Sequence, residues 1–402
     1  DRRRPRPLVA AGPYTREFDR RYPGSLLLYR PAQLPELIQR SWSNLPSAGW
    51  KRGTGGTDRS RRRTGLRRPA QPGRRAGPMT ISRDITTDTG PTVSTVASID
   101  NGVLVLPDGR MVVPGNRWDL VPAGIVIPDP MVSVIVPYYR DRRQLDLLLE
   151  ALSGQDYPSD NYEIIVVDDG SPEPLSLSST NRNGTRVLVL RQADEGFRAA
   201  AARNLGVSQA TGEVLCFLDQ DTLPEPEYLR RLIRLPSVLP DALVVGRRRH
   251  ADLTGWTPAR VQAWLTGNSP APPEFTPPAW LADAYRGSGD LLHVDDTSYR
   301  FVISAVMCCS AMLYRELGGF DESFTRYGGE DWELAFRAYN AGAVLAHEPS
   351  AVAWHDGPDW AGRGDEAARE QEKDEERLAL ARRIPDLARI GPRWMPSPDR
   401  PT

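Results

Sequence analysis

The stretch that decides the fold is Val214-Leu215-Cys216-Phe217-Leu218-Asp219-Gln220-Asp221-Thr222, a short apolar run that ends in two carboxylates. An apolar run of this length is typical of a strand that is buried on both faces. Alternate side chains of an extended chain point the same way, so Asp219 and Asp221 converge just past the strand. Two hard oxygen ligands suit Mg²⁺ or Mn²⁺ that still carries water and diphosphate oxygens. A plain Asp-rich turn after a strand has the same residues, so the rest of the chain must decide between the two interpretations.

Strands and helices alternate upstream of this stretch. Three more apolar runs precede it, over 131–137, 162–168 and 186–190. Helical patterns follow the first and third runs, with leucines between 145 and 152 and a helix expected near 197–209. Because the strands are apolar throughout, the pattern predicts an α/β fold with a mostly parallel sheet, flanked by helices, whose ligands gather at the carboxyl ends of the strands.

The sequence downstream predicts further elements of the same domain. Helices are expected over 227–235 and 330–340, a strand over 243–246, a return to the core over 301–314, and two short strands within 343–354. Residues 254–290 are rich in Pro, Gly, Trp and Ser and are expected to form a long surface excursion.

The charge is divided unevenly along the chain. Residues 1–78 contain 19 Lys and Arg against 5 Asp and Glu, whereas residues 79–402 contain 32 against 47. We expect a disordered basic tail over 1–78, a short β element over 79–130 with a hairpin turn at Pro107-Asp108-Gly109-Arg110, a main domain over 131–360, and a charged C-terminal helix and tail over 361–402. An acidic body of this kind argues against a nucleic-acid partner.

Cysteine usage and hydropathy bear on the compartment. Cys216, Cys308 and Cys309 lie in apolar runs without CxxC spacing, so we expect buried thiols in a reducing compartment. The longest apolar run, 301–314, is too short for a membrane span, and no signal peptide is recognised at the start. The expected location is cytoplasmic, with a peripheral contact to the inner face of the membrane as an alternative.

Polar groups follow three of the predicted strands and should share one sheet edge: Pro137 to Asp141, Asp168-Asp169 and Asp219 to Asp221. Neither GxGxxG nor GxxxxGK[ST] follows any strand, so a metal is the natural means to hold a diphosphate. Asp168 would then be free to accept hydrogen bonds from a base or ribose. Arg203 and Asn204, on the preceding helix, could reach the same pocket.

A second group of residues is Tyr327-Gly328-Gly329-Glu330-Asp331-Trp332-Glu333. The glycines permit a tight turn into a helix whose first residues are Glu330 and Asp331, where exposed N–H groups favour ionised carboxylates. These carboxylates could simply cap the helix, but an ionised carboxylate is also what a general base requires. Trp332 could stack on a sugar ring.

A third candidate is His355, which follows a predicted strand. Its neutral imidazole could complete a metal shell with Asp221. The other histidines, His250, His293 and His347, have no comparable setting, and we expect them to be structural or exposed.

Taken together, these segments resemble the inverting family 2 glycosyltransferases of the GT-A fold from about Val132 to Gly357. The resemblance rests on segments in a fixed order, which are Val132-Ser133-Val134-Ile135-Val136-Pro137, Val167-Asp168-Asp169-Gly170-Ser171, Ala202-Arg203-Asn204-Leu205-Gly206 and Leu218-Asp219-Gln220-Asp221-Thr222. The part from Gly318-Gly319-Phe320-Asp321-Glu322 to Glu330-Asp331 resembles galactosyl- and N-acetylgalactosaminyltransferases.

The resemblance implies a nucleotide-diphosphate sugar donor, most often UDP-linked, and Mn²⁺ or Mg²⁺ as cofactor. It divides the main domain into a nucleotide-sugar half, 131–246, and an acceptor half, 300–360. The implied site residues are as follows: Pro137, Tyr138, Arg140, Asp168, Arg203 and Asp219 bind the nucleotide sugar; Asp219, Asp221 and His355 bind metal; Glu330 and Asp331 are catalytic, with Asp331 as the base; and Gly329 and Trp332 bind the acceptor.

The function that this implies is the transfer of one sugar, with inversion, to a hydroxyl of a saccharide, lipid-linked or small-molecule acceptor. The QxxRW motif of processive synthases is missing, which favours single-sugar transfer. One alternative is a non-catalytic nucleotide- or carbohydrate-binding protein of the same fold. A sugar nucleotidyltransferase is less favoured, because Pro137-Tyr138-Tyr139-Arg140 stands where such enzymes carry a Gly-rich loop.

Overall fold

The structure of the chain is a computed structural model. It describes residues 79–81, 97–100, 102–106, 108–125, 129–276, 279–326, 328–357, 380 and 383–384. The predicted basic tail over 1–78 lies outside these residues, as does nearly all of the predicted C-terminal segment over 361–402.

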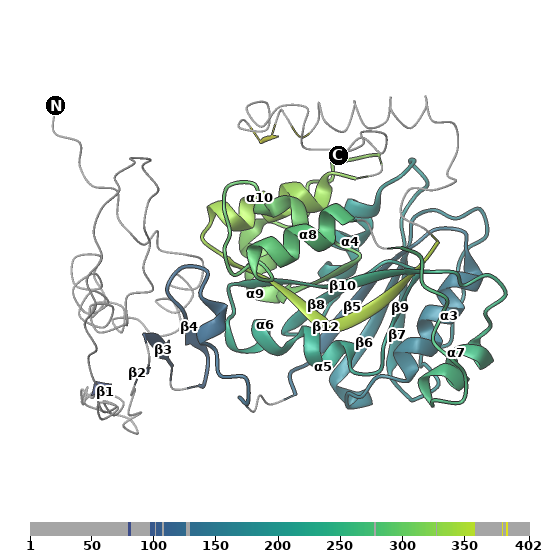
Figure 1. Cartoon of the computed structure of the whole chain (residues 1–402). Coiled ribbons are helices and arrows are strands. Elements are labelled where there is room, and N and C mark those ends of the chain that lie inside the picture. Colours follow the sequence, from purple (N-terminus) through teal and green to yellow (C-terminus); the bar gives the residue numbers. More distant parts are fainter. Residues whose placement is uncertain are drawn as a thin grey trace, which may run out of the picture.

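An eight-stranded sheet forms the centre of the main domain (Figure 1). Its strands, in spatial order, are β7 (Arg186–Arg191), β6 (Tyr162–Asp168), β5 (Val132–Tyr138), β8 (Val214–Leu218), β11 (Val306–Ser310), β10 (Ala242–Ala251), β12 (Val344–Asp356) and β9 (Thr222–Pro224). Strands β7, β6, β5 and β8 run parallel, as do β10 and β12, whereas β11 and β9 are antiparallel to their neighbours. The mostly parallel α/β sheet is therefore confirmed, and β5, β6 and β8 are buried along almost their whole length.

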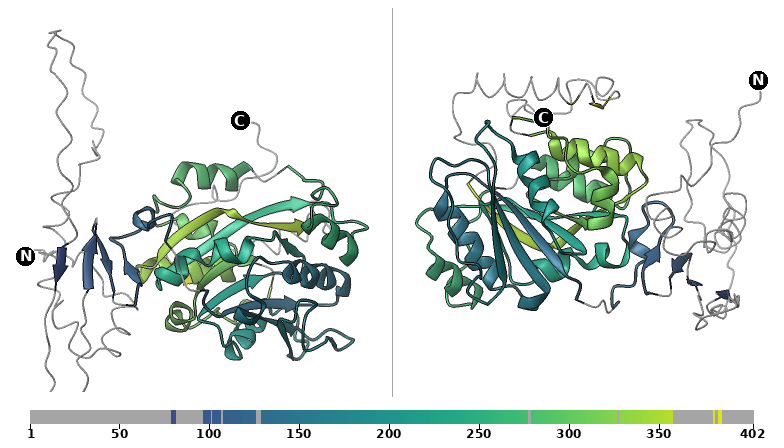
Figure 2. Two further views of the ribbon diagram at one scale, coloured as in Figure 1. Left: turned by 90° about the horizontal axis from the view of Figure 1, so that it is seen from below. Right: turned by 180° about the vertical axis from the view of Figure 1, so that it is seen from behind.

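Helices cover both faces of this sheet (Figure 2). They are α3 (Arg142–Ser153), α4 (Ala199–Ser208), α5 (Tyr228–Leu232), α6 (Arg234–Val238), α7 (Pro258–Leu265), α8 (Ala279–Ser288), α9 (Ala311–Leu317) and α10 (Glu330–Asn340). Helix α4 packs on β5 and β6, where a Cβ on Gly206 would come within 2.6 Å of the Cγ2 of Ile135. A second, smaller core lies between α3, α7 and β12 and includes Leu147, Val261 and Trp354.

A small antiparallel sheet precedes the main domain. Its strands are β1 (Met79–Ile81), β2 (Ala97–Asp100), β3 (Val103–Val105) and β4 (Met111–Val112). The predicted hairpin is confirmed between β3 and β4, where Gly109 takes the positive φ of 85° that the turn requires. Asn116 joins this part to the main domain, because its amide donates to the carbonyls of Leu291 and Leu345 and accepts from the Leu345 N–H.

Two expectations about local structure were wrong. The 254–290 segment is not irregular throughout, because it contains α7 and α8. Helix α7 begins with Thr257, which caps the Arg260 N–H, followed by Pro258 in the first turn. The two short strands expected near 343–354 are one bent strand, β12, because a bulge opposite Gly246 and Arg247 absorbs the extra residues and lets pairing with β10 continue to Asp356.

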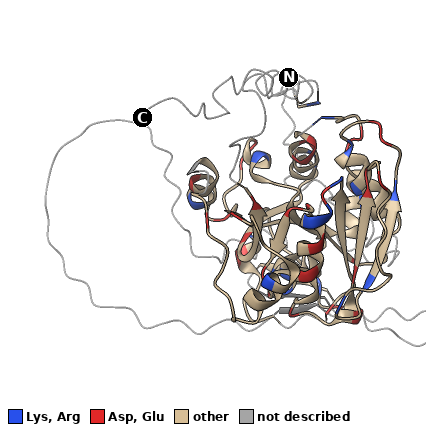
Figure 3. Cartoon of the chain, turned by 90° about the vertical axis from the view of Figure 1, so that its right-hand side faces the viewer, with Lys and Arg blue, Asp and Glu red and all other residues tan. Residues whose placement is uncertain are grey.

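Acidic and basic positions are interspersed over the described part of the chain (Figure 3). Many form ion pairs between neighbouring elements, such as Arg143 with Asp356 at 2.8 Å. Among the residues that the structure describes, no helix combines the length and the apolar composition that crossing a bilayer requires.

Candidate active site

Arg203 joins the two groups of carboxylates that the sequence singled out. Its side chain is almost fully buried, and its guanidinium lies 2.8 Å from the Oδ1 of Asp219 and 2.9 Å from the Oε1 of Glu330. Burial alone would lower the pKa of Arg203, but the charges of the two carboxylates outweigh it and raise that pKa. The end of β8 and the start of α10 are thus held together by one cation from α4.

Glu330 and Asp331 begin α10 as predicted, after Gly328 and Gly329 with φ of 97° and 89°. Asp331 accepts from the N–H of Trp332 at 2.9 Å and, at 3.4 Å, from that of Ser304. Tyr327, the first residue of the predicted group, lies outside the described residues.

The expectation that the helix N-terminus keeps Asp331 ionised is wrong in direction. Burial first, and then the neighbouring charge of Glu330, raise the pKa of Asp331 to about 7, although Arg203 and the two N–H groups oppose this shift. A carboxyl group with a pKa near neutrality is well matched to accepting and releasing a proton at physiological pH.

Asp221 and His355 meet because β9 pairs with the end of β12, with Thr222 opposite His355. The Nε2 of His355 lies 3.4 Å from the Oδ2 of Asp221, and its buried Nδ1 makes no hydrogen bond to a described residue. His250, one strand away, packs its ring 5.1 Å from that of His355, measured between centroids. Because His250 is 1% exposed and adjoins the candidate ligand, it belongs to the surroundings of the site, which sequence spacing did not indicate.

The three predicted metal ligands do not form one group. Asp219 faces Arg203, whereas Asp221 faces His355. Within the described part of the chain, no cluster of three or more His, Cys, Asp or Glu side chains is arranged to hold a metal. Only Asp221 and His355 are therefore placed as a pair of candidate ligands.

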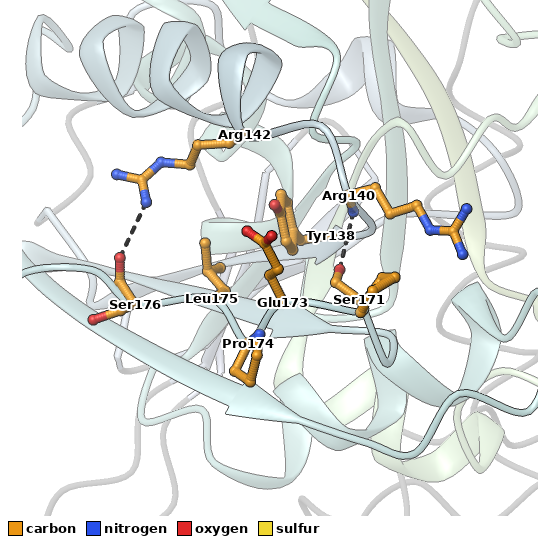
Figure 4. A pocket seen from close by; sticks show the side chains of 9 residues that line it. Tyr138, Arg140, Arg142, Ser171, Glu173, Pro174, Leu175 and Ser176 are labelled. Carbon is orange, nitrogen blue, oxygen red and sulfur yellow. Dashed lines mark hydrogen bonds between the residues drawn. The ribbon is translucent and has the colours of Figure 1, made fainter.

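A cavity of about 340 Å³ opens where β5 and β6 end (Figure 4). Tyr138 and Arg140, two of the residues predicted to bind the nucleotide sugar, line it together with Arg142 and the 171–176 loop. The Arg140 N–H donates to the Oγ of Ser171, and the Arg142 guanidinium donates to the carbonyl of Ser176 (Figure 4). The loop that follows β6 therefore forms one wall of the cavity.

Asp168 is not free to bind a nucleotide in this structure, contrary to the expectation. Its fully buried carboxylate accepts hydrogen bonds from the N–H groups of Ser171 and Leu175 and from the guanidinium of Arg191 at 2.6 Å. Its observed role is to hold the loop that lines the cavity.

Two more predicted residues stand apart from the cavity. Pro137 lies within β5, half-buried, and is absent from the cavity wall. Asn204 joins α4 to the Gly319-containing segment, since it donates to the Phe320 carbonyl and accepts from the Phe320 N–H and the Tyr314 hydroxyl. The space beside it admits only glycine, because a Cβ at position 319 would lie 2.7 Å from the Asn204 Oδ1.

Gln220, between the two aspartates, is a site residue that sequence reasoning missed. Its amide accepts from the Tyr139 N–H at 2.7 Å and donates to the Tyr139 carbonyl at 3.2 Å. The ends of β5 and β8 are thereby held at a fixed separation. The sequence feature that could have indicated this role is the side-chain amide between the two aspartates, because its donor and its acceptor can both pair with a peptide group.

Gly329 and Trp332, the predicted acceptor-binding residues, flank the acid pair. Gly329 is the N-cap of α10, and Trp332 is half-buried against the main core. Both are close to Asp331 in the chain, and their binding of an acceptor stays a prediction.

Two family models match consecutive parts of the chain. Residues 133–292 match glycosyl transferase family 2, and residues 292–350 match the model described as the N-terminal domain of galactosyltransferase. Together they contain Arg203, Asp219, Glu330 and Asp331.

Curated relatives carry glycosyltransferase or synthase names. The chain is 27% identical over 240 residues to the chondroitin synthase of Escherichia coli, covering 56% of this chain and 35% of that protein. It is 29% identical over 228 residues to the validoxylamine A glucosyltransferase of Streptomyces hygroscopicus subsp. jinggangensis (strain 5008), covering 54% and 53%. The chain thus spans about half or less of the length of these relatives. Among solved structures, S. aureus TarS in complex with UDP-GlcNAc is 18% identical, covers 62% of this chain and 66% of that chain, and has a TM-score of 0.43.

Most of the segments that build the site lie within the matched residues, and His355 lies just beyond them. Strand β5 from Ser133 onward, helix α4, the end of β8 and the start of α10 lie within 133–350, which the two models cover without a gap. Residues 133–292 therefore form a glycosyl transferase family 2 domain, which residues 292–350 continue with a segment that matches the galactosyltransferase model.

Proposed function

We propose that the chain is a metal-dependent, inverting glycosyltransferase that moves one sugar from a UDP-linked donor to an acceptor hydroxyl. The observation that carries the proposal is the double pairing of Arg203 with Asp219 and Glu330. It supports a single site to which the nucleotide-sugar half, 131–246, and the acceptor half, 300–360, both contribute.

Asp331 is the proposed base of a single displacement. Its carboxylate takes the proton of the acceptor hydroxyl while the oxygen forms a bond to the anomeric carbon from the face opposite the leaving group. The bond from that carbon to the diphosphate oxygen breaks, the configuration inverts, and the nucleotide diphosphate leaves. The pKa of about 7 supports this role, because the carboxyl group can accept a proton near neutral pH and release it after each turnover.

Asp221 and His355 are the proposed holders of Mn²⁺ or Mg²⁺. The Nε2 of His355 and the Oδ2 of Asp221 lie 3.4 Å apart, a spacing at which both could ligate one cation that takes its remaining ligands from water and diphosphate oxygens. A bound cation would neutralise negative charge on the leaving diphosphate.

The cavity beside Tyr138 is the proposed seat of the nucleotide. It lies at the carboxyl ends of parallel strands, where α/β sheets generally bind ligands, and its wall carries two arginines, Arg140 and Arg142, and one carboxylate, Glu173. We expect Asp168 to act indirectly by holding the loop.

The acceptor is proposed to be a saccharide or a small hydroxylated molecule, since the names of the relatives include both glycan synthases and a validoxylamine glucosyltransferase. We place the activity in the cytoplasm. Its basis is that Cys216, Cys308 and Cys309 are buried in apolar strands without CxxC spacing, the setting of structural thiols in a reducing compartment.

The test uses a panel of nucleotide sugars and p-nitrophenyl glycosides, with products identified by mass spectrometry. We expect the wild type to transfer the sugar. In Asp331→Asn, kcat should fall by about 10²–10⁴-fold, since that is the usual contribution of a general base. Binding of UDP should be retained, because Asp331 lies outside the cavity wall.

Glu333→Gln is the matched control. Glu333 lies on the same first turn of α10 but pairs with Arg337 instead of facing the site. Its turnover should stay close to that of the wild type. If Asp331→Asn turns over like the wild type, Asp331 is not the base. A wild type that binds UDP but acts on no donor would favour a binding protein.

A further inference from the structure

Trp280 is an exposed aromatic side chain in a segment to which the motifs assign no role. It lies at the start of α8, and 37% of its surface is exposed. Large exposed hydrophobic side chains are rare in the described part of the chain, and Tyr139, another of them, adjoins the site through Gln220. An exposed tryptophan is costly to leave in water and is frequently a binding residue.

The ring of Trp280 is supported from below. Its centroid lies 6.5 Å from that of Phe301, with the planes inclined by 40°. Tyr285 fixes Phe301 in turn, since its hydroxyl donates to the Phe301 carbonyl at 2.6 Å and its own ring stacks on His347 at 3.6 Å. Trp280 therefore presents a supported face and not a freely moving side chain.

This aromatic pair lies close to the proposed base. Phe301 ends the short helix η4 (Ser298–Phe301), which both α8 and α10 contact, and Figure 1 shows these two helices on the same side of the sheet. Ser304, three residues later, donates its N–H to Asp331. Three residues span at most about 10 Å, so Phe301 starts within that distance of the residue that contacts Asp331, and the ring of Trp280 lies one ring contact further on.

We propose that Trp280, backed by Phe301, stacks on the second sugar ring of a saccharide acceptor and so favours acceptors longer than one ring. The aromatic face covers the apolar C–H face of the sugar while the first ring offers its hydroxyl to Asp331. This inference rests on the proposed glycosyl transfer.

The test compares Trp280→Ala, Trp280→Phe and Arg286→Ala with the wild type. Arg286 is the surface control on the same helix, where it is 77% exposed and pairs with Asp283. The acceptors are p-nitrophenyl glycosides of one monosaccharide and of the matching disaccharide. Hydrolysis of the donor without acceptor is measured alongside.

Trp280→Ala should raise KM for the disaccharide about tenfold, equivalent to about 1.4 kcal/mol. It should change KM for the monosaccharide by less than about twofold. The kcat, the donor KM, donor hydrolysis and the thermal midpoint should stay at wild-type values. Trp280→Phe should restore most of the affinity, and Arg286→Ala should behave as the wild type.

Equal KM values for Trp280→Ala and the wild type on the disaccharide would overturn the inference, as would a parallel loss of kcat and donor hydrolysis, which marks a structural role. Either result leaves the proposed function standing if Asp331→Asn still abolishes transfer. If the wild type neither transfers nor hydrolyses any nucleotide sugar, the proposed function fails, and this inference fails with it.

Discussion

Arg203 is the residue on which the electrostatics of the site depend. Its guanidinium balances two carboxylates that reach it from segments more than a hundred residues apart in the chain. Only arginine offers several donors in a rigid planar fork, so the two contacts do not compete for one hydrogen. We therefore assign Arg203 a positioning role toward Glu330 as well as its predicted role near the donor.

Replacing Arg203 by methionine should destabilise the fold by about 3–5 kcal/mol, because it leaves the buried Glu330 carboxylate without its cation. Urea unfolding followed by circular dichroism measures this difference. Arg117→Met is the control, since Arg117 forms an exposed pair with Asp119 and should cost no more than about 1 kcal/mol. A loss for Arg203→Met as small as that of the control would contradict the assignment.

Asp331 should impose a pH dependence on activity. With a pKa of about 7, the basic form is scarce at pH 5 and predominates at pH 8, so kcat/KM should rise with pH through about 7 and level off above about pH 8. The raised pKa also means that the folded state binds this proton more tightly than the unfolded chain. The contribution of Asp331 to stability is therefore present below the ordinary pKa of aspartate and is lost as the pH rises toward 7.

Asp331→Asn separates the two effects, because its residual activity should lack the acid limb. Relative to the wild type, its thermal midpoint should rise between pH 4 and 7 and then stay level. An acid limb that persists in this variant would assign the titration to another group.

At the level of elements, the start of α10 was the most predictable part of the site. Two glycines followed by Glu330 and Asp331 fix where the helix begins, and the helix ends at Asn340, just before Gly342, as expected. That β12 is one continuous strand could not be predicted from the sequence. A bulge is defined by pairing with another strand, and Pro349 taken alone indicates the end of a strand.

Helix α4 gives a prediction about packing. Gly206→Ala should destabilise by about 1–3 kcal/mol, because the new methyl group meets Ile135 on the strand beneath. Gly287→Ala in α8 is the matched control, since nothing lies within 4 Å of its Cβ and the helix should gain up to about 1 kcal/mol. Urea midpoints of both variants test this, and a gain for Gly206→Ala would show that α4 does not press on β5.

At the level of the whole molecule, metal and nucleotide should stabilise the fold together. Mn²⁺ and UDP, each added at about a hundred times its dissociation constant, should each contribute about 2.7 kcal/mol, which appears as a rise in the thermal midpoint. His355→Ala should remove the metal-dependent part and keep the response to UDP alone. A Mn²⁺ response that is unchanged in His355→Ala would mean that another set of residues holds the cation.

The sequence predicted which residues would meet better than it predicted what each would do. The meeting of Asp221 with His355 follows from strand ends that share one edge, and that of Arg203 with Asp219 follows from the helix that precedes strand β8. The hydrogen bonds between Asp168 and the loop that follows it could not be predicted from the sequence, because the number of N–H groups around a carboxylate depends on how the loop folds back. The pKa of Asp331 was misjudged for a similar reason, since enclosure by neighbouring segments outweighed the helix terminus.

The bond between Arg203 and Glu330 has a practical consequence for protein engineering. The two family models meet at residue 292, a position at which the chain could be divided into two complementary fragments. The first fragment on its own would expose Arg203 without Glu330 and the unpaired edge of β8. The second would expose Glu330 without Arg203 and the unpaired edge of β11. A split reporter protein divided at residue 292 should therefore give no signal until both fragments are produced together.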